Sequence, residues 1–167
     1  MIALLGSMIF GMLVPFAIIY TRGLFSRKLV DKHDLDKLTS TSILAEIPRL
    51  NSKENELIQL NDVSPLAESF RILVTNIKFL LPKKEGAKII FVTSTIKGEG
   101  KTFISVNLSL ALASSQNRVL VIGSDIRNPQ LQRYNPSMKA AKGLTEFLHG
   151  ETKDASAIIH PSGFHPN

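Results

Sequence analysis

The chain has 167 residues, a formal net charge of +6 and no cysteine. The missing cysteines exclude disulfides, iron–sulfur clusters and thiolate zinc sites. The positive charge is compatible with an anionic partner, but the basic residues are dispersed and no aromatic residues interleave with them, so nucleic-acid binding is not expected. The four histidines have no ligand spacing, which argues against a histidine metal site. The length allows one modest domain with an appendage.

The first segment, residues 1–21, contains no charged side chain and is close to the shortest length that spans a bilayer. It lacks the basic start and the small-residue cleavage site of a signal peptide. Basic residues follow it at Arg22, Arg27 and Lys28, which places the C-terminal part in the cytoplasm. We therefore predict one transmembrane helix at 1–21 and a juxtamembrane linker at 22–60.

A helix is predicted to begin at Ser64-Pro65, because serine is a favoured N-cap and proline fits the first turn. Apolar residues then recur at spacings of four and three, which indicates one face packed on a core. These residues are Leu66, Phe70, Leu73, Ile77 and Leu80.

The region 87–129 carries the strongest chemical signal. An apolar, β-branched run at 89–92 leads into a loop that closes on Gly100-Lys101-Thr102, and a periodic apolar segment follows directly. A second apolar run at 118–122 comes at the right distance for a strand–helix–strand unit. Thr95 stands where the phosphate-loop pattern has its first glycine. The context predicts a nucleotide-binding P-loop between two parallel strands.

The loop residues have separate expected roles. Lys101 would reach the β- and γ-phosphates of ATP, and the Thr102 hydroxyl would be a ligand of the Mg²⁺ that they carry. Lys97 could contact phosphate, or it could be a solvated loop charge. The predicted cofactor-binding residues are Lys97, Gly98, Glu99, Gly100, Lys101 and Thr102.

The second apolar run ends in Gly123-Ser124-Asp125-Ile126-Arg127. Here the chain resembles the bacterial tyrosine kinases (BY-kinases) of the polysaccharide co-polymerase type, which are P-loop relatives of the MinD and ParA ATPases. That family has an Asp-x-Asp-x-Arg motif after the P-loop helix. Asp125 and Arg127 match it, whereas Gly123 replaces the first aspartate. The resemblance implies Lys101, Asp125 and Arg127 as catalytic residues, and Thr102 and Asp125 as metal ligands.

The resemblance also implies the architecture. We expect an α/β fold with an incomplete, MinD/ParA-like parallel sheet of the P-loop NTPase class, preceded by the transmembrane helix. Residues 61–167 would be the N-terminal part of the kinase domain. In the family, a Glu-x-x-Arg-x-x-Arg helix makes subunit contacts. Glu68 and Arg71 match its first two positions, and an intrahelical pair worth about 0.2–0.5 kcal/mol is the competing interpretation.

By this resemblance the protein would be an ATP- and Mg²⁺-dependent protein-tyrosine autokinase of the cell inner membrane that regulates capsular or exopolysaccharide chain length and export. Its partners would be further copies of itself, the tyrosine tails of neighbouring subunits and the polysaccharide export machinery. Two alternatives stay open. One is a MinD/ParA-like membrane-associated ATPase, and the other is a non-catalytic polysaccharide co-polymerase, which Gly123 favours slightly.

No strand that resembles the family's Walker B strand follows Asp125, and the chain has only two tyrosines, so no tyrosine-rich tail is visible. We expect this sequence to be an incomplete piece of a longer protein. Phosphoryl transfer depends on a positioned metal and charge-stabilising groups. We therefore also expect this chain alone to show no measurable autophosphorylation.

Overall fold

The chain divides into two compact units, Met1–Ile43 and Leu44–Asn167. Arg27 and Lys28, which supported the predicted orientation in a membrane, lie outside the described residues. The computed structural model describes residues 2–25, 32–51, 55–59, 61–83, 86–114 and 117–164.

The first unit contains helix α1 (Ile2–Phe25) and the short helix α2 (Lys32–Asp36). Crossing a bilayer takes about 20 consecutive apolar residues. Within the described residues, no helix combines the length and the apolar character that such a span needs. The helix predicted at 1–21 does form, but its assignment as a transmembrane segment is contradicted by this finding.

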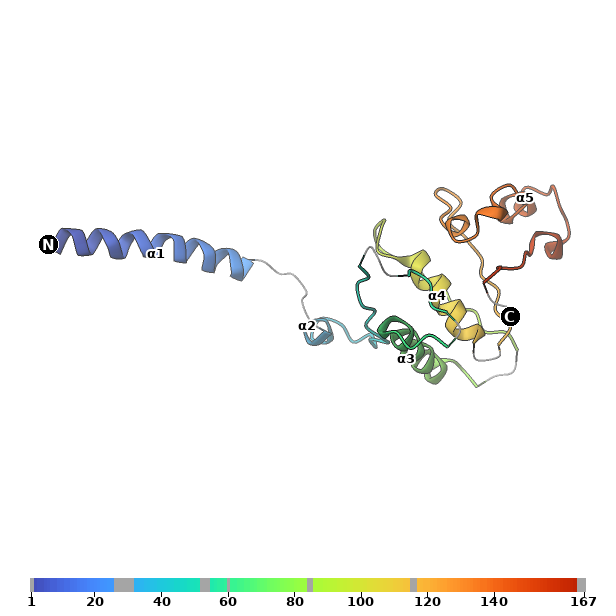
Figure 1. Cartoon of the computed structure of the whole chain (residues 1–167), viewed down its shortest axis with the longest axis horizontal. Helices are drawn as coiled ribbons and strands as arrows, with labels where there is room; N and C mark the ends of the chain where they lie inside the picture. Colours follow the sequence, from blue (N-terminus) through green and yellow to red (C-terminus); the bar gives the residue numbers. More distant parts are fainter. Residues whose placement is uncertain are drawn as a thin grey trace. The chain divides into compact units, whose positions relative to one another are not determined.

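The second unit is built on two helices, α3 (Pro65–Leu80) and α4 (Lys101–Ala113) (Figure 1). The Ser64 hydroxyl accepts a hydrogen bond from the Ala67 amide at 3.2 Å, and Pro65 occupies the first turn. The N-cap prediction for α3 is therefore confirmed. The helix predicted after the glycine loop is confirmed as well, because α4 begins at Lys101.

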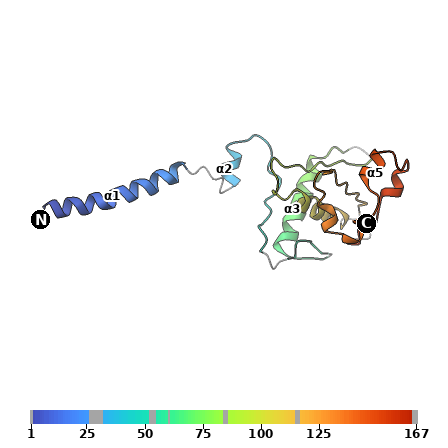
Figure 2. The same ribbon diagram turned by 90° about the horizontal axis from the view of Figure 1, so that it is seen from above.

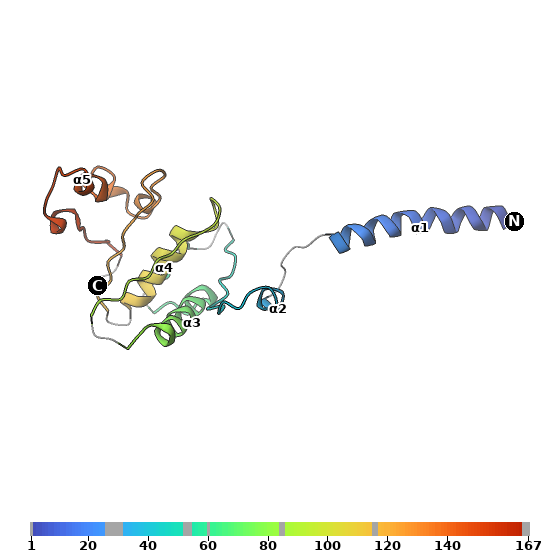
Figure 3. The same cartoon turned by 180° about the vertical axis from the view of Figure 1, so that it is seen from behind.

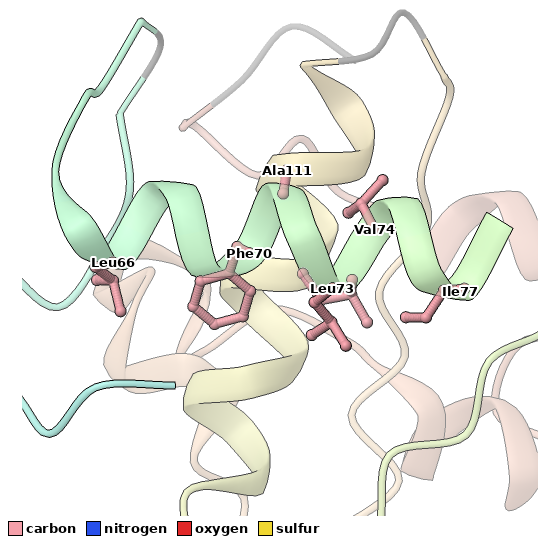
Figure 4. Packing of buried hydrophobic residues seen from close by; sticks show 7 residues of the cluster. Leu66, Phe70, Leu73, Val74, Ile77 and Ala111 are labelled. Atoms are coloured by element: carbon pink, nitrogen blue, oxygen red, sulfur yellow. The ribbon is translucent and has the colours of Figure 1, made fainter. Parts of the chain in front are cut away.

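The core lies where α3 packs on α4. Phe70 is fully buried, and its ring meets the ring of Phe103 on α4 edge-on, with the centroids 6.0 Å apart. Figure 4 shows Phe70 on the apolar face of α3 with other side chains of the core. Burying a large apolar side chain contributes about 1.5–3 kcal/mol. The core cluster consists of Leu66, Phe70, Leu73, Val74, Ile77, Leu108 and Ala111.

The predicted α/β fold is wrong for this structure, because the described residues contain no β-strand. The run at 89–92 still has a strand-like alternation of side chains: Ile90 and Val92 pack against the core, whereas Ile89 and Phe91 are exposed. Figure 3 shows the ribbon of this region running beside α4. A strand is defined by hydrogen bonds to a neighbour. The run has the pattern of a strand without the ladder.

The second apolar run behaves in the same way. Leu120 and Ile122 are exposed, whereas Val119 and Val121, which alternate with them, are half-buried. Parallel sheets are stable when both faces are covered. Here one side of each run faces solvent, so neither run has the environment of a strand in a parallel sheet.

After α4, the helices among the described residues of the second unit are short (Figure 2). Helix α5 (Leu144–Leu148) begins after Gly143, where the Glu146 carboxylate accepts a hydrogen bond from the Gly143 amide at 2.7 Å. The short helices are η1 (Leu131–Arg133), η2 (Pro136–Met138), α5 (Leu144–Leu148) and η3 (Ala155–Ile158).

A buried amide ties the chain before α3 to α4. Asn107 is fully buried, and its Oδ1 accepts a hydrogen bond from the Ile58 amide at 2.9 Å. Its Nδ2 donates to the carbonyls of Glu56 at 2.8 Å and Phe103 at 3.0 Å. Because buried polar groups are costly unless they are paired, this side chain fixes residues 56–58 on α4.

Candidate functional site

The loop before α4 contains two glycines with positive φ. Gly98 has φ 94° and Gly100 has φ 90°, both in the left-handed region that only glycine adopts at little cost. Gly100 is the N-cap of the 13-residue helix α4, whose first turn contains no acidic side chain. The positive end of the helix dipole therefore points into the loop, which favours an anion there.

Lys101 and Asp125 are brought together, although they come from different segments. The Lys101 Nζ lies 4.0 Å from Asp125 Oδ2, and the two side chains are 35% and 41% exposed. A solvent-exposed pair at this distance contributes little to stability, between about 0 and 1 kcal/mol. Both groups remain accessible to a ligand, so the arrangement suits binding better than structural support.

The second oxygen of Asp125 holds the following turn. Asp125 Oδ1 accepts a hydrogen bond from the Asn128 amide at 3.0 Å, a side-chain to backbone turn typical of aspartate. Arg127 lies in this turn and is exposed. Within the described part of the chain, Arg127 forms no ion pair with the other predicted site residues. The turn thus orients Asp125 toward Lys101 and leaves Arg127 facing solvent.

Glu99 is engaged inside the loop. Its Oε2 accepts hydrogen bonds from the backbone amides of Thr95 at 2.9 Å and Ile96 at 3.2 Å. Lys97, between these amides and Gly98, is exposed. Thr102 follows Lys101 in the first turn of α4 and is half-buried. The predicted cofactor-binding residues therefore form one continuous loop and helix start.

Only one carboxylate of the motif is present near Lys101. Gly123 occupies the position of the other, and its backbone lies next to the side chain of Leu131. Across the residues that the structure describes, there is no cluster of three or more histidine, aspartate and glutamate side chains able to hold a metal ion. Any Mg²⁺ at this loop would need phosphate oxygens among its ligands, which is the usual arrangement for nucleotide-bound Mg²⁺.

A polar cluster joins Glu56, in the segment before α3, to Arg133 and Tyr134 at the end of η1. Arg133 Nη2 donates to Glu56 Oε2 at 2.5 Å and to the Tyr134 hydroxyl at 3.2 Å, and its guanidinium carbon lies 5.1 Å from the centre of the Tyr134 ring. Burial raises the pKa of Tyr134 above its usual 10.0, against the opposing effect of Arg133. These residues line a shallow groove of about 410 Å³.

Sequence reasoning missed this cluster, because Glu56 is far from Arg133 along the chain and no spacing rule connects them.

Glu68 and Arg71 pair within α3. Arg71 Nη1 donates to Glu68 Oε2 at 3.0 Å, and its Nη2 donates to the carbonyl oxygen of Asp62. The Arg71 and Glu68 side chains are 47% and 60% exposed. The intrahelical interpretation accounts for the contacts seen in one chain, and a role between subunits stays a prediction.

Comparison with known proteins supplies the context for this loop. Over 151 residues the chain is 28% identical to the tyrosine-protein kinase Ptk of Acinetobacter johnsonii, a match that covers 83% of this chain and 20% of the relative. It is 38% identical over 98 residues to the tyrosine-protein kinase CpsD of Streptococcus pneumoniae, covering 59% of this chain and 41% of CpsD. It is also 33% identical over 114 residues to the tyrosine-protein kinase CpsD of Streptococcus agalactiae, a match that covers 63% of this chain and 48% of that relative.

No family model and no solved structure matches the chain. The chain is nevertheless similar to several bacterial tyrosine-protein kinases over much of its length, which confirms the resemblance inferred from the motifs. It spans between a fifth and a half of the length of these relatives.

Proposed function

We propose that this chain binds ATP with Mg²⁺ through the loop at 98–102 and Asp125, as part of a bacterial protein-tyrosine kinase. The approach of Lys101 to Asp125 is the observation that carries the proposal, because it unites the lysine of the P-loop with the aspartate of the second motif. The left-handed glycines and the N-terminus of α4 support it. Similarity to proteins named tyrosine-protein kinases supports the reaction class.

Each residue has a chemical task in this proposal. The loop amides from Gly98 onward and the dipole of α4 hold the phosphates, and the Lys101 ammonium neutralises their charge. The Thr102 hydroxyl and the Asp125 carboxylate are oxygen ligands of the type that Mg²⁺ prefers. The bound metal neutralises charge that develops on the transferring phosphoryl group. Arg127, exposed beside Asp125, is available to stabilise the same charge.

The reaction and its partners are proposed for the longer protein. ATP held at this loop would phosphorylate tyrosines on neighbouring subunits, in a system that controls capsular or exopolysaccharide export. Subunit contact through Arg71 would require it to exchange its bonds to Glu68 and Asp62 for bonds to another copy. An arginine fork makes such an exchange feasible, because it presents five donors.

A second candidate function is favoured by Gly123. With one motif carboxylate missing, the loop would bind nucleotide without efficient turnover, and the protein would be a non-catalytic polysaccharide co-polymerase. Phosphotyrosine formation in the longer protein separates the two functions. Labelling that disappears in Lys101→Ala supports the kinase, whereas nucleotide binding without labelling supports the co-polymerase.

Nucleotide binding is tested by isothermal titration of the whole chain with ATP and Mg²⁺. Lys101→Ala should abolish detectable binding, because it removes the cation at the mouth of the loop that pairs with Asp125. Lys97→Ala is the matched control, since it removes the same charge from an exposed position in the same loop. Equal losses in both variants would contradict the proposed placement of the phosphates.

A further inference from the structure

The Glu99 side chain turns back onto its own loop. One oxygen, Oε2, accepts the amide hydrogens of both Thr95 and Ile96, at 2.9 and 3.2 Å. These two residues open the eight-residue segment that ends in Lys101-Thr102. Glu99 itself is exposed, so the carboxylate is held by the loop backbone and not by burial in the core.

A single anionic oxygen that accepts two successive backbone amides is held firmly in the loop. Hydrogen bonds to an ionised acceptor are about twice as strong as neutral ones. The loop therefore already contains an anion, and that anion belongs to the chain. Its position has a direct consequence for any ligand that brings its own negative charge.

The cations nearby do not neutralise Glu99. Lys101 is directed to Asp125 at 4.0 Å, and in the described part of the chain no ion pair includes Glu99. Lys97 is exposed at the tip of the loop. Two carboxylates, Glu99 and Asp125, thus face a site whose expected ligand is a polyphosphate. Like charges at short range repel, more strongly near a protein surface than in bulk water.

We propose that Glu99 weakens nucleotide binding: its carboxylate, held in the loop by the Thr95 and Ile96 amides, places a negative charge beside the site proposed for the phosphates. This inference rests on the proposed ATP-binding function and assigns a regulatory role within the same site. Repulsion between Glu99 and the phosphates lowers the affinity for ATP.

Two variants separate repulsion from simple tethering of the loop. Glu99→Gln keeps an oxygen that can accept both amides but removes the charge, whereas Glu99→Ala removes the acceptor as well. If Glu99 repels the phosphates, both variants bind ATP more tightly than the wild type, by roughly three- to tenfold. The gain of Glu99→Gln should shrink as salt is added, because salt screens exposed charges.

The experiment is isothermal titration of the whole chain with ATP and Mg²⁺. Glu151→Gln is the matched control, since it removes one negative charge from the segment after α5 and should leave the affinity unchanged. Circular dichroism of each variant confirms that the helices are retained.

The outcomes distinguish this inference from the function on which it depends. Unchanged affinity in Glu99→Gln together with weaker binding in Glu99→Ala would show that Glu99 only tethers the loop, and would overturn the inference. Weaker binding in both variants would overturn it too. Absence of ATP binding in the wild type and in both Glu99 variants would contradict the ATP-binding function itself.

Discussion

Asp125 divides its two carboxylate oxygens between two tasks: Oδ2 lies 4.0 Å from the Lys101 ammonium, and Oδ1 accepts the Asn128 amide at 3.0 Å. The hydrogen bond to Oδ1 fixes the orientation of the carboxylate, and Oδ2 lies beside Lys101 in the proposed P-loop. A ligand metal could therefore replace Lys101 at Oδ2 without any change in the turn.

Asp125→Asn tests this division. Asparagine keeps an oxygen for the Asn128 amide but loses the charge beside Lys101, so the turn should persist. We expect the gain in ATP affinity that Mg²⁺ provides to fall about tenfold, because a metal ligand is lost, whereas metal-free ATP, no longer repelled by the carboxylate, binds at least as tightly as to the wild type. Titration with and without Mg²⁺ measures both quantities. Asp36→Asn, at the end of α2, is the control. If Mg²⁺ raises the ATP affinity of the variant as much as that of the wild type, Asp125 is not a metal ligand.

Phe70→Ala tests the α3–α4 core. Phe70 is fully buried against Phe103, so its truncation leaves a cavity and should lower the free energy of unfolding by about 3–5 kcal/mol. Phe79→Ala is the matched control on the same helix, because Phe79 is 84% exposed and its loss should change stability by less than about 0.5 kcal/mol. Urea titration followed by circular dichroism gives both values. Similar losses would mean that the two helices do not pack as described.

Asn107→Ala tests the hydrogen bonds that join residues 56–58 to α4. In Asn107→Ala the amide of half-buried Ile58 and the carbonyl of exposed Glu56 lose their partner, and each hydrogen bond lost costs about 0.5–1.5 kcal/mol. We expect a total loss of about 1–3 kcal/mol in the same urea titration. Asn117→Ala is the control, since exposed Asn117 makes a single bond to the Leu112 carbonyl. A loss no larger than that of the control would show that residues 56–58 are not held by α4.

The helices could be predicted because their signals are local. The Ser64-Pro65 start and the spacing of the apolar residues define α3 within one segment, and the same reasoning placed the start of α4 at Lys101. The two strands predicted from the sequence do not form in the described residues, because a strand does not depend on local signals alone. Apolar alternation at 89–92 specifies which side chains face the core, but a ladder also needs a neighbouring strand, and the described residues provide none.

The candidate site also contains features that the sequence predicts and features that it does not. Motif spacing was enough to single out the loop, Lys101 and Asp125 as candidates. The approach of Lys101 to Asp125 depends on how the chain after α4 folds back toward the start of that helix. The bonds of Glu99 to the Thr95 and Ile96 amides depend on the rotamer of a side chain inside the loop, which no spacing rule encodes.

Acid should weaken the start of α3. Asp62 Oδ1 accepts the Ser64 amide at 2.7 Å, and this bond, more than the nearby Arg71 charge, lowers the pKa of Asp62 below its usual 3.8. A carboxylate whose pKa is lowered in the folded state stabilises the fold at pH values above its unfolded-state pKa. This contribution to stability disappears as the pH falls through the folded-state pKa. The effect is under about 1 kcal/mol because solvent screens the group.

Unfolding free energies measured above and below pH 3.8 test this expectation, with Asp62→Asn as the comparison. The variant should lose less stability on acidification than the wild type. Identical acid profiles would show that Asp62 makes no pH-dependent contribution to the helix start.

Gly123→Asp restores the missing carboxylate of the second motif. Gly123 is not among the glycines with positive φ, and a Cβ built there meets only the Leu131 side chain, at 3.4 and 3.5 Å, which is ordinary contact. Aspartate should therefore be accommodated without backbone strain. Because a second carboxylate adds an oxygen ligand and a negative charge near the proposed metal, we expect Mg²⁺-dependent ATP affinity to rise by roughly three- to tenfold. Gly123→Asn, which has nearly the same shape and no charge, should give no such gain. Equal affinities in the aspartate and asparagine variants, measured by titration with Mg²⁺, would show that position 123 does not face the metal and that its glycine does not limit this site.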